Sequence, residues 1–288
     1  RLPSLDALEP RVVFEAASEA EIHRDRLSAL FDRYLLTGGY PHSTEAENTE
    51  RTIPPYVYQL HQDAIRGEMV RAGYRERYFR ELVSWVGHHR LGREFSWRDA
   101  SGETELGSKD TVRRYIEDAQ DLFVWHVFHR VKDPARPEVA LRSPKKLYPA
   151  DPFAWHVLSA WARGERDPWK VSLDASADPE TRGQLVESVV ADHLRRAFGE
   201  FACYHRDARG TREIDFVLFP GSEGRYLVEV KQGRRVRAGD QRAMAEAGGG
   251  VLVSRDALAF HEDTRVAVVP VASFLAVLGY SMSLYPAR

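Results

Sequence analysis

The C-terminal third of the chain has the pattern that most restricts the possible fold. Asp178, Pro179 and Glu180 predict a helix start, because they supply an N-cap, a proline at the first helical position and an acid in the first turn. Apolar residues follow at helical spacing as far as Phe198. Short runs typical of strands then cover residues 201–205, 214–219, 226–231, 251–254 and 266–271, with helical patterns near 238–247 and 273–278. This order predicts an α/β domain with a mixed central sheet flanked by helices.

The preceding part of the chain has mostly helical patterns. Apolar residues recur at helical spacing over residues 19–36 and 53–90, and the glycines and proline within residues 37–41 end the first of these patterns. Residues 107–116 predict a turn followed by a short helix that begins after Ser108. Residues 122–128 predict a strand. The whole chain is therefore expected to be an α+β protein of more than one domain.

Composition excludes several classes of protein. Hydrophobic residues make up 43% of the chain and charged residues 29%, which is typical of a folded globular protein. No apolar run approaches the roughly 20 residues that a membrane-spanning helix needs, so we expect a soluble, cytoplasmic protein. The single cysteine, Cys203, rules out a disulfide framework and a cysteine-based zinc cluster. A formal net charge of −2 means that any site for a polyanion must be a local patch.

Two of the predicted strands bring charged residues together. Residues 220–224 are rich in turn formers, so the runs 214–219 and 226–231 are expected to form a hairpin. If Phe219 lies opposite Tyr226, then Asp215 lies opposite Val230, give or take one residue. Side chains alternate along a strand, so Glu229 and Lys231 point to the same face. Asp215, Glu229 and Lys231 are therefore expected to converge at one end of the sheet.

Two carboxylates and an ammonium group among apolar neighbours favour a metal-dependent site. A divalent cation relieves the repulsion between two nearby carboxylates, and Mg²⁺ binds through one or two carboxylates, water and phosphate oxygens. Such an ion activates water and polarises a phosphodiester. Lys231 is the only lysine after Lys170 in an arginine-rich chain, and its compact charge suits the steering of water or the neutralisation of transition-state charge. We therefore expect Mg²⁺ or Mn²⁺ as cofactor.

These residues carry a family resemblance. They are Glu187 in the predicted helix, Asp215 in the run 214–219 and Glu229-Val230-Lys231 in the run 226–231. Their order resembles the PD-(D/E)XK nuclease core, including its archaeal Holliday-junction-resolvase-like branch. The resemblance implies that Asp215 and Glu229 bind the metal ion, that Glu187 supports it and that Lys231 assists hydrolysis. Gln232 occupies a position where some members have a further polar residue. The chain departs from the formal motif because Ile214, not proline, precedes Asp215.

A second resemblance covers nearly the whole chain. The segments 34–41, 111–116, 143–151 and 185–187 together resemble the C-terminal region, a domain of unknown function, of a prokaryotic AAA+-type ATP-binding protein family. The resemblance implies a helical segment over residues 1–52 that links to an upstream ATPase domain, a helical domain with a winged helix-turn-helix over 53–173, and a restriction-endonuclease-like domain over 174–288. The chain contains no phosphate-binding loop, so ATP is expected only through that upstream domain.

These resemblances imply that the partner is DNA, either duplex or branched. Lys109, Thr111, Arg113 and Arg114 would lie on a recognition helix, and Arg212, Arg234 and Arg235 would form a phosphate-binding rim around the acidic site. The alternatives are a helical hairpin used for packing and an ordinary solvated arginine surface. Three functions therefore stay open: a DNA endonuclease, an inactive nuclease fold that binds DNA or protein for the ATPase, and an assembly domain that mediates homo-oligomer contacts.

Overall fold

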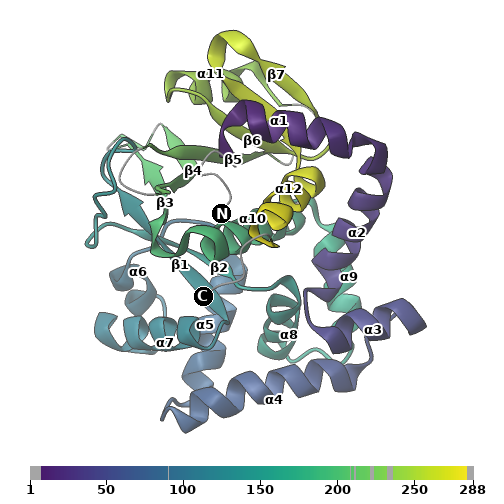
Figure 1. Cartoon of the computed structure of the whole chain (residues 1–288). Helices are drawn as coiled ribbons and strands as arrows, with labels where there is room; N and C mark the ends of the chain where they lie inside the picture. Colours follow the sequence, from purple (N-terminus) through teal and green to yellow (C-terminus); the bar gives the residue numbers. More distant parts are fainter. Residues whose placement is uncertain are drawn as a thin grey trace. The chain divides into compact units, whose positions relative to one another are not determined.

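The computed structural model describes residues 8–89, 91–207, 209–210, 212–220, 224–231 and 236–283 (Figure 1). The chain divides into two compact units, and both are built from separate segments. The first comprises Arg1–Phe31, His129–Leu141 and His193–Arg288, and the second comprises Asp32–Phe128 and Arg142–Asp192. The sequence instead predicts three consecutive domains, and that linear division stays a prediction.

The first unit contains most of a mixed β-sheet. Its strands are the end of β1 (Trp125–Val131), β3 (Ala202–Arg206), β4 (Glu213–Leu218), β5 (Tyr226–Lys231), β6 (Gly250–Ser254), β7 (Ala259–His261) and β8 (Val266–Pro270). Along the sheet they follow the order β1-β3-β4-β5-β6-β8-β7. The pairs β3–β4, β4–β5 and β7–β8 are antiparallel, whereas β1–β3, β5–β6 and β6–β8 are parallel. The mixed sheet predicted from the sequence is confirmed.

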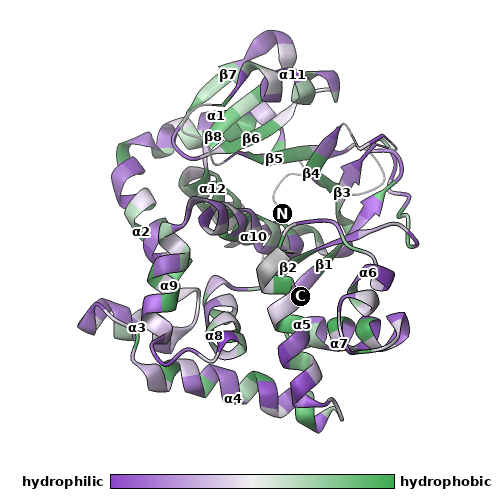
Figure 2. Cartoon of the chain, turned by 180° about the vertical axis from the view of Figure 1, so that it is seen from behind, coloured by the Kyte–Doolittle hydropathy of each residue, from purple (hydrophilic) through white to green (hydrophobic). Residues whose placement is uncertain are grey.

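Helices cover both faces of this sheet in the first unit. They are α1 (Pro10–Glu19), the end of α10 (Pro179–Phe198), α11 (Ala238–Glu246) and α12 (Val271–Ser283), with short 3-10 turns at Ala20–His23, Gly199–Phe201 and Glu262–Thr264. Met244 of α11 packs with Leu252 on one face. The alternate residues Val251 and Val253 are fully buried as well, and α1 and α12 contact β6 and β8. Burial on both faces explains why β6 and β8 are nearly continuous apolar runs, which are green in Figure 2.

The second unit is mainly helical. It contains most of α2 (Arg24–Thr37) and of α10, all of α3 (Pro41–Glu50), α4 (Pro55–Arg71), α5 (Glu76–His89), α6 (Trp97–Gly102), α7 (Lys109–Asp121), α8 (Pro152–Arg163) and α9 (Pro168–Ala177), the start of β1, and β2 (Lys145–Pro149) next to it. Phe79 and Leu82 of α5, and Ile116 of α7, are fully buried in its core. None of the described helices has both the length and the apolar content to cross a membrane.

Side-chain caps explain several of the helix starts. The predicted caps Ser108 and Asp178 accept hydrogen bonds from the backbone N–H groups of Thr111 and Thr181, at 3.1 and 2.8 Å. The hydroxyl of Ser96, which no sequence pattern marked as a cap, caps α6. The second predicted domain boundary, after residue 173, lies inside α9, which Asp167 caps and Pro168 begins. The strand predicted over residues 122–128 begins only at Trp125, because Phe123 has a left-handed backbone conformation (φ 56°).

Candidate active site

The hairpin of β4 and β5 sets the geometry of the candidate site. Leu218 lies opposite Tyr226, and Phe216 lies opposite Val228. The same register places Asp215 opposite Glu229, so both side chains project from one face of the sheet. This register differs by one residue from the pairing of Phe219 with Tyr226, within the stated margin. The shift brings the two carboxylates closer than the predicted pairing of Asp215 with Val230.

Where the pairing of β4 with β5 ends, the carboxylates of Asp215 and Glu229 accept hydrogen bonds from backbone N–H groups of the facing strand. The N–H of Asp215 donates to Oε2 of Glu229 at 3.0 Å, and the N–H of Val230 donates to Oδ2 of Asp215, also at 3.0 Å. Lys231 Nζ donates to Oε1 of Glu229 at 2.7 Å. The three side chains predicted to converge therefore do so, and we call them the Asp215–Glu229–Lys231 cluster.

Burial makes this cluster electrostatically unusual. Asp215 is only 8% exposed, and the side chain of Glu229 is 13% exposed. Burial, and then the charge of Asp215, raise the pKa of Glu229 to about 8 although Lys231 opposes the shift. Burial alone lowers the pKa of Lys231, but the charge of Glu229, the hydrogen bond to it and the charge of Asp215 raise that pKa overall. Glu229 thus keeps its proton near neutral pH, chiefly because the carboxyl is buried and then because Asp215 lies beside it.

An open pocket of about 890 Å³ gives solvent access to Glu229 and Lys231. Asp240 and Met244 of α11 line one side of it, and Arg209 lines another. The negative charge of Asp240 also contributes to the raised pKa of Lys231. The pocket is therefore large enough for a nucleotide-sized group and has charges of both signs on its walls.

The donor set of the cluster fits a hard divalent cation. Asp215 and Glu229 supply carboxylate oxygens, which Mg²⁺ and Mn²⁺ prefer, and one or two protein carboxylates suffice for Mg²⁺ when water and phosphate complete the shell. Burial and then the charge of Asp215 raise the pKa of Glu229, and a bound cation would stabilise its charged form. Among the described residues, no three or more His, Cys, Asp or Glu side chains gather closely enough to form a protein-only metal site.

Glu187, the fourth predicted catalytic residue, lies on the part of α10 that belongs to the second unit. There it accepts a hydrogen bond from the hydroxyl of Tyr148 at 2.6 Å and lies 3.5 Å from Nζ of Lys146. Lys146 and Tyr148 alternate on β2 and are almost fully buried. Glu187 thus neutralises a buried lysine within its own unit, and its role beside a metal ion stays a prediction.

The predicted nucleic-acid contacts have different surroundings. Lys109, Arg113 and Arg114 are exposed on α7, and Thr111 is half-buried beside the Ser108 cap. Arg113 is paired with Glu117 at 2.9 Å, and the helix also carries Asp110, Asp118 and Asp121. Arg212 lines the pocket of the cluster and is paired with Glu246 at 2.5 Å. Gln232, Arg234 and Arg235 lie outside the described residues.

Some residues of the site were not found from the sequence. Asp240 and Arg225 line the pocket, and Arg225 donates to the carbonyl of Ala247 at 2.8 Å. Neither residue belongs to a motif, and the packing of α11 against β6 brings Asp240 to this pocket. The buried Lys146–Tyr148–Glu187 contact had a weak signal, since Lys146 and Tyr148 are spaced to share one face of a strand.

Comparison with known families gives two matches. A model described as "Domain of unknown function (DUF8612)" matches residues 28–164, and one described as "Domain of unknown function (DUF4143)" matches residues 182–274. The second of these domains is commonly found as the C-terminal region of AAA-type ATPase proteins. No curated protein and no solved structure matches the chain.

Proposed function

We propose that the chain hydrolyses DNA phosphodiesters with a divalent metal ion bound at the Asp215–Glu229–Lys231 cluster. The observation that carries this proposal is the buried, hydrogen-bonded pair of carboxylates with a lysine at the wall of an open pocket. A strand with the pattern Glu-x-Lys is common by chance. A facing aspartate that exchanges hydrogen bonds with that strand, with its carboxylate buried, is a much more restrictive arrangement.

Each residue of the cluster has a distinct task in this proposal. Asp215 and Glu229 hold the metal ion. The hydrogen bonds that their carboxylates accept from backbone N–H groups fix the orientation of both side chains. When bound, Mg²⁺ or Mn²⁺ supplies Lewis-acid polarisation of the phosphate and a water of lowered pKa. Lys231 keeps its proton because both carboxylates favour its charged form. It therefore offers a fixed positive charge to the attacking water or to the phosphate oxygens.

The DNA would be positioned by the second unit and by the arginines at the pocket. The order of α5, α6, α7, β1 and β2 supports the proposal of a winged helix, and the isolated bridge between Phe95 and Lys145 would take the place of its short first strand. Lys109, Arg113 and Arg114 would contact the backbone from α7, and Arg209 and Arg212 would contact it at the pocket. An ATPase domain of the same protein would precede this region, and the complex could be a homo-oligomer.

The alternative function is a nuclease fold that has lost activity and binds DNA or protein for the ATPase. The observation in its favour is that the described residues offer two carboxylates at the cluster without a third metal ligand. The acidic residues and the Arg113–Glu117 pair of α7 also weaken the positive field that duplex DNA requires.

Cleavage of supercoiled plasmid in Mg²⁺, Mn²⁺ or EDTA separates these functions. We expect metal-dependent nicking that falls at least 100-fold in Asp215→Asn, which keeps an oxygen for the N–H of Val230 but loses the charge. Asp256→Asn is the matched control, because Asp256 is exposed and pairs only with its neighbour Arg255 in the described contacts. Equal cleavage by both variants would point to a contaminating nuclease, and salt-dependent DNA binding without cleavage would support the inactive module.

Lys231→Met tests catalysis separately from metal binding. The substitution keeps both carboxylates and the stem of the side chain, so Mg²⁺ should still raise the melting temperature of the variant. Plasmid nicking should nevertheless fall about 100-fold, because the fixed charge beside the phosphate is gone. A variant that nicks at the wild-type rate would remove Lys231 from the mechanism.

A further inference from the structure

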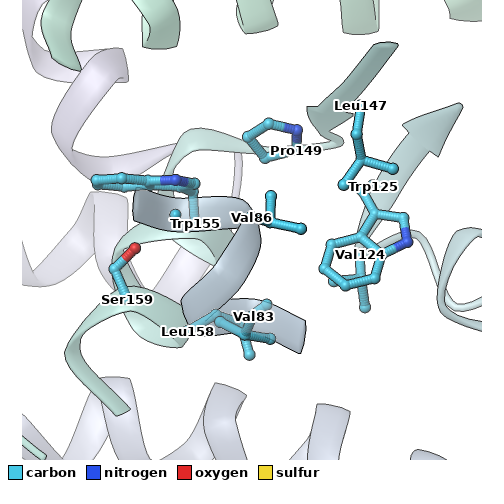
Figure 3. A pocket seen from close by; sticks show the side chains of 10 residues that line it. Val83, Val86, Val124, Trp125, Leu147, Pro149, Trp155, Leu158 and Ser159 are labelled. Atoms are coloured by element: carbon cyan, nitrogen blue, oxygen red, sulfur yellow. The ribbon is translucent and has the colours of Figure 1, made fainter. Parts of the chain in front are cut away.

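Three exposed arginines lie at the start of α5 in the second unit. Arg75 directly precedes the helix, and Arg77 and Arg80 lie within its first five residues. The opposite face of α5 is apolar, because Val83 and Val86 line a small apolar pocket in the core of this unit with residues of β1, β2 and α8 (Figure 3). The amphipathic spacing of α5 therefore leaves the arginines in solvent, and we call these three residues the α5 arginines.

Two aromatic rings hold the guanidinium groups of the α5 arginines. The Cζ atoms of Arg77 and Arg75 lie 4.4 and 5.9 Å from the centre of the Tyr78 ring. The Cζ atom of Arg80 lies 5.9 Å from the centre of the Trp161 ring. Arg77 also donates to the hydroxyl of Tyr78 at 2.6 Å. Because a cation is attracted to the face of an aromatic ring, these side chains lose freedom before a partner arrives, which lowers the entropic cost of binding.

The positive charge of the α5 arginines is not neutralised by direct contacts. In the part of the chain that the structure describes, none of the three forms an ion pair with a carboxylate. The neighbouring acids have other partners: Glu76 pairs with Arg66 at 2.6 Å, and Glu81 accepts the N–H of Glu105 at 2.6 Å. Glu81 and Glu105 act on Arg77 only through their charge, not as ion-pair partners. Two guanidinium groups thus share one ring, an arrangement of like charges that favours a bound anion.

The surface formed by the α5 arginines continues onto α7. The ring of Tyr74, the residue before Arg75, packs against Tyr115 of α7 with ring centroids 4.2 Å apart. The hydroxyl of Tyr74 donates to Asp118, which occupies that carboxylate. Burial raises the pKa of Tyr74 to about 12, and Arg114 lies close enough for its positive charge to oppose this rise. Arg114, one of the predicted nucleic-acid contacts on α7, is therefore part of the same surface.

We propose that the α5 arginines, together with Arg114, bind the phosphate backbone of DNA. This inference rests on DNA as the substrate of the proposed function, but not on hydrolysis at the Asp215–Glu229–Lys231 cluster. A planar guanidinium group binds a phosphate through two parallel N–H bonds. Contacts of this kind fix a protein on a duplex without reading its bases. We therefore expect the second unit to bind DNA in a manner that depends on salt and not on sequence.

The test measures binding of the full chain to a fluorescein-labelled duplex by fluorescence anisotropy, in EDTA so that no cleavage occurs. In the triple variant Arg75→Gln/Arg77→Gln/Arg80→Gln, we expect DNA affinity to fall at least about 30-fold at about 100 mM NaCl. The slope of log affinity against log salt should fall by about 2 to 3, because each phosphate contact contributes about 0.9. The corresponding triple lysine variant keeps the charge, so it should keep most of this slope while losing the bidentate contacts.

The matched control is Arg24→Gln/Arg255→Gln/Arg265→Gln. It removes the same charge from three exposed arginines that each lie beside a carboxylate. We expect its DNA affinity to stay within about threefold of wild type. An equal loss of affinity in both triple variants would show that DNA responds to the overall charge and would refute the surface.

Thermal unfolding of each variant shows whether the fold is kept. If the triple glutamine variant does not fold, the double variant Arg75→Gln/Arg77→Gln gives the same test. It preserves the hydrogen bond from Arg80 to the carbonyl of Ala162, and the expected fall in slope is then about 2. Wild-type affinity and wild-type slope in the folded variant would overturn the proposal. Displacement of the duplex by polyglutamate as effectively as by unlabelled DNA would overturn it too, and would assign the surface to an acidic protein.

The outcome is distinguishable from that of the nuclease proposal. Loss of DNA affinity in the glutamine variant, with no plasmid nicking by wild type in any metal, would leave this surface supported and the hydrolysis refuted. Nicking by wild type with unchanged DNA affinity in the variant would have the opposite meaning. The two proposals therefore fail separately.

Discussion

Glu229→Gln should abolish metal-dependent cleavage and at the same time make the metal-free protein more stable at alkaline pH. In the unfolded chain this carboxyl titrates near 4.5, whereas burial and Asp215 raise its pKa to about 8 in the fold. The folded protein therefore binds the proton more tightly, and stability is lost as the pH rises from about 4.5 to about 8. The neutral amide removes this loss, so the variant should gain about 2 to 4 kcal/mol relative to wild type across that range.

Urea unfolding at pH 5 and pH 9 in EDTA measures the effect. Wild type should lose stability between the two pH values by more than Glu229→Gln does, and Mg²⁺ should restore stability to wild type alone. Plasmid nicking should fall at least 100-fold because one metal-binding oxygen becomes an amide. Glu262→Gln is the matched control, because Glu262 is exposed and pairs with Arg11 at the surface. An identical pH dependence of stability in wild type and Glu229→Gln would show that Glu229 does not carry the buried proton.

The pH dependence of stability and the loss of cleavage together separate a role of the Asp215–Glu229–Lys231 cluster in folding from a role in metal binding. A pair of carboxylates kept only for folding would be expected to stabilise the protein, and replacing one of them would then lower stability at every pH. A pair that destabilises the metal-free fold and is relieved by a cation is a site whose strain is retained for binding. The hydrogen bonds from Asp215 N–H and Val230 N–H orient these carboxylates without removing their repulsion.

The sequence predicts local features of this protein better than long-range ones. The bounds of β5 follow directly from its alternating pattern, and the start of α10 follows from Asp178 and Pro179, because both depend on neighbouring residues. The convergence of Asp215 and Glu229 required only one short turn, so an error of one residue in register did not separate them. β7 was missed because it is three residues long and half-buried, with no strong alternation.

Contacts between distant segments could not be predicted in this way. The helix α1 packs against β8, although more than 200 residues separate them, and nothing in the composition of residues 10–19 indicates that partner. Glu187 was identified as a metal ligand by its order along the chain. Its bonds to Lys146 and Tyr148 depend on how β2 meets α10, which periodicity does not determine.

Two segments that the sequence analysis singled out, residues 37–41 and 143–151, meet in one structural contact. Thr37 ends α2, and Gly38 then takes a left-handed conformation with φ 58°. The next N–H, that of Gly39, donates to Oδ2 of Asp151 at 2.8 Å. The other oxygen of Asp151 caps α8 by accepting from the N–H of Phe153 at 2.7 Å. Asp151 thus joins the end of one helix to the start of another, and its burial raises its pKa to about 6.

Gly38→Ala should therefore destabilise the second unit severely. A Cβ atom at Gly38 would lie 1.9 Å from Oδ1 of Asp151, so the carboxylate would have to leave its cap, and alanine is strained at this positive φ. We expect a loss of about 3 to 5 kcal/mol in the free energy of unfolding and a fall of roughly 10 °C in melting temperature. Gly39→Ala is the matched control, because its Cβ would lie 3.6 Å from Asp151, an ordinary contact.

A double-mutant cycle with Asp151→Ala separates the clash from the backbone strain. Removing the carboxylate alone costs the α8 cap and the bond to Gly39, but it also removes the atoms that the new methyl group would meet. The loss in the double variant should therefore be smaller than the sum of the two single losses by at least about 1 kcal/mol. Strictly additive losses would mean that the left-handed conformation of Gly38 alone, and not its approach to Asp151, requires glycine at this position.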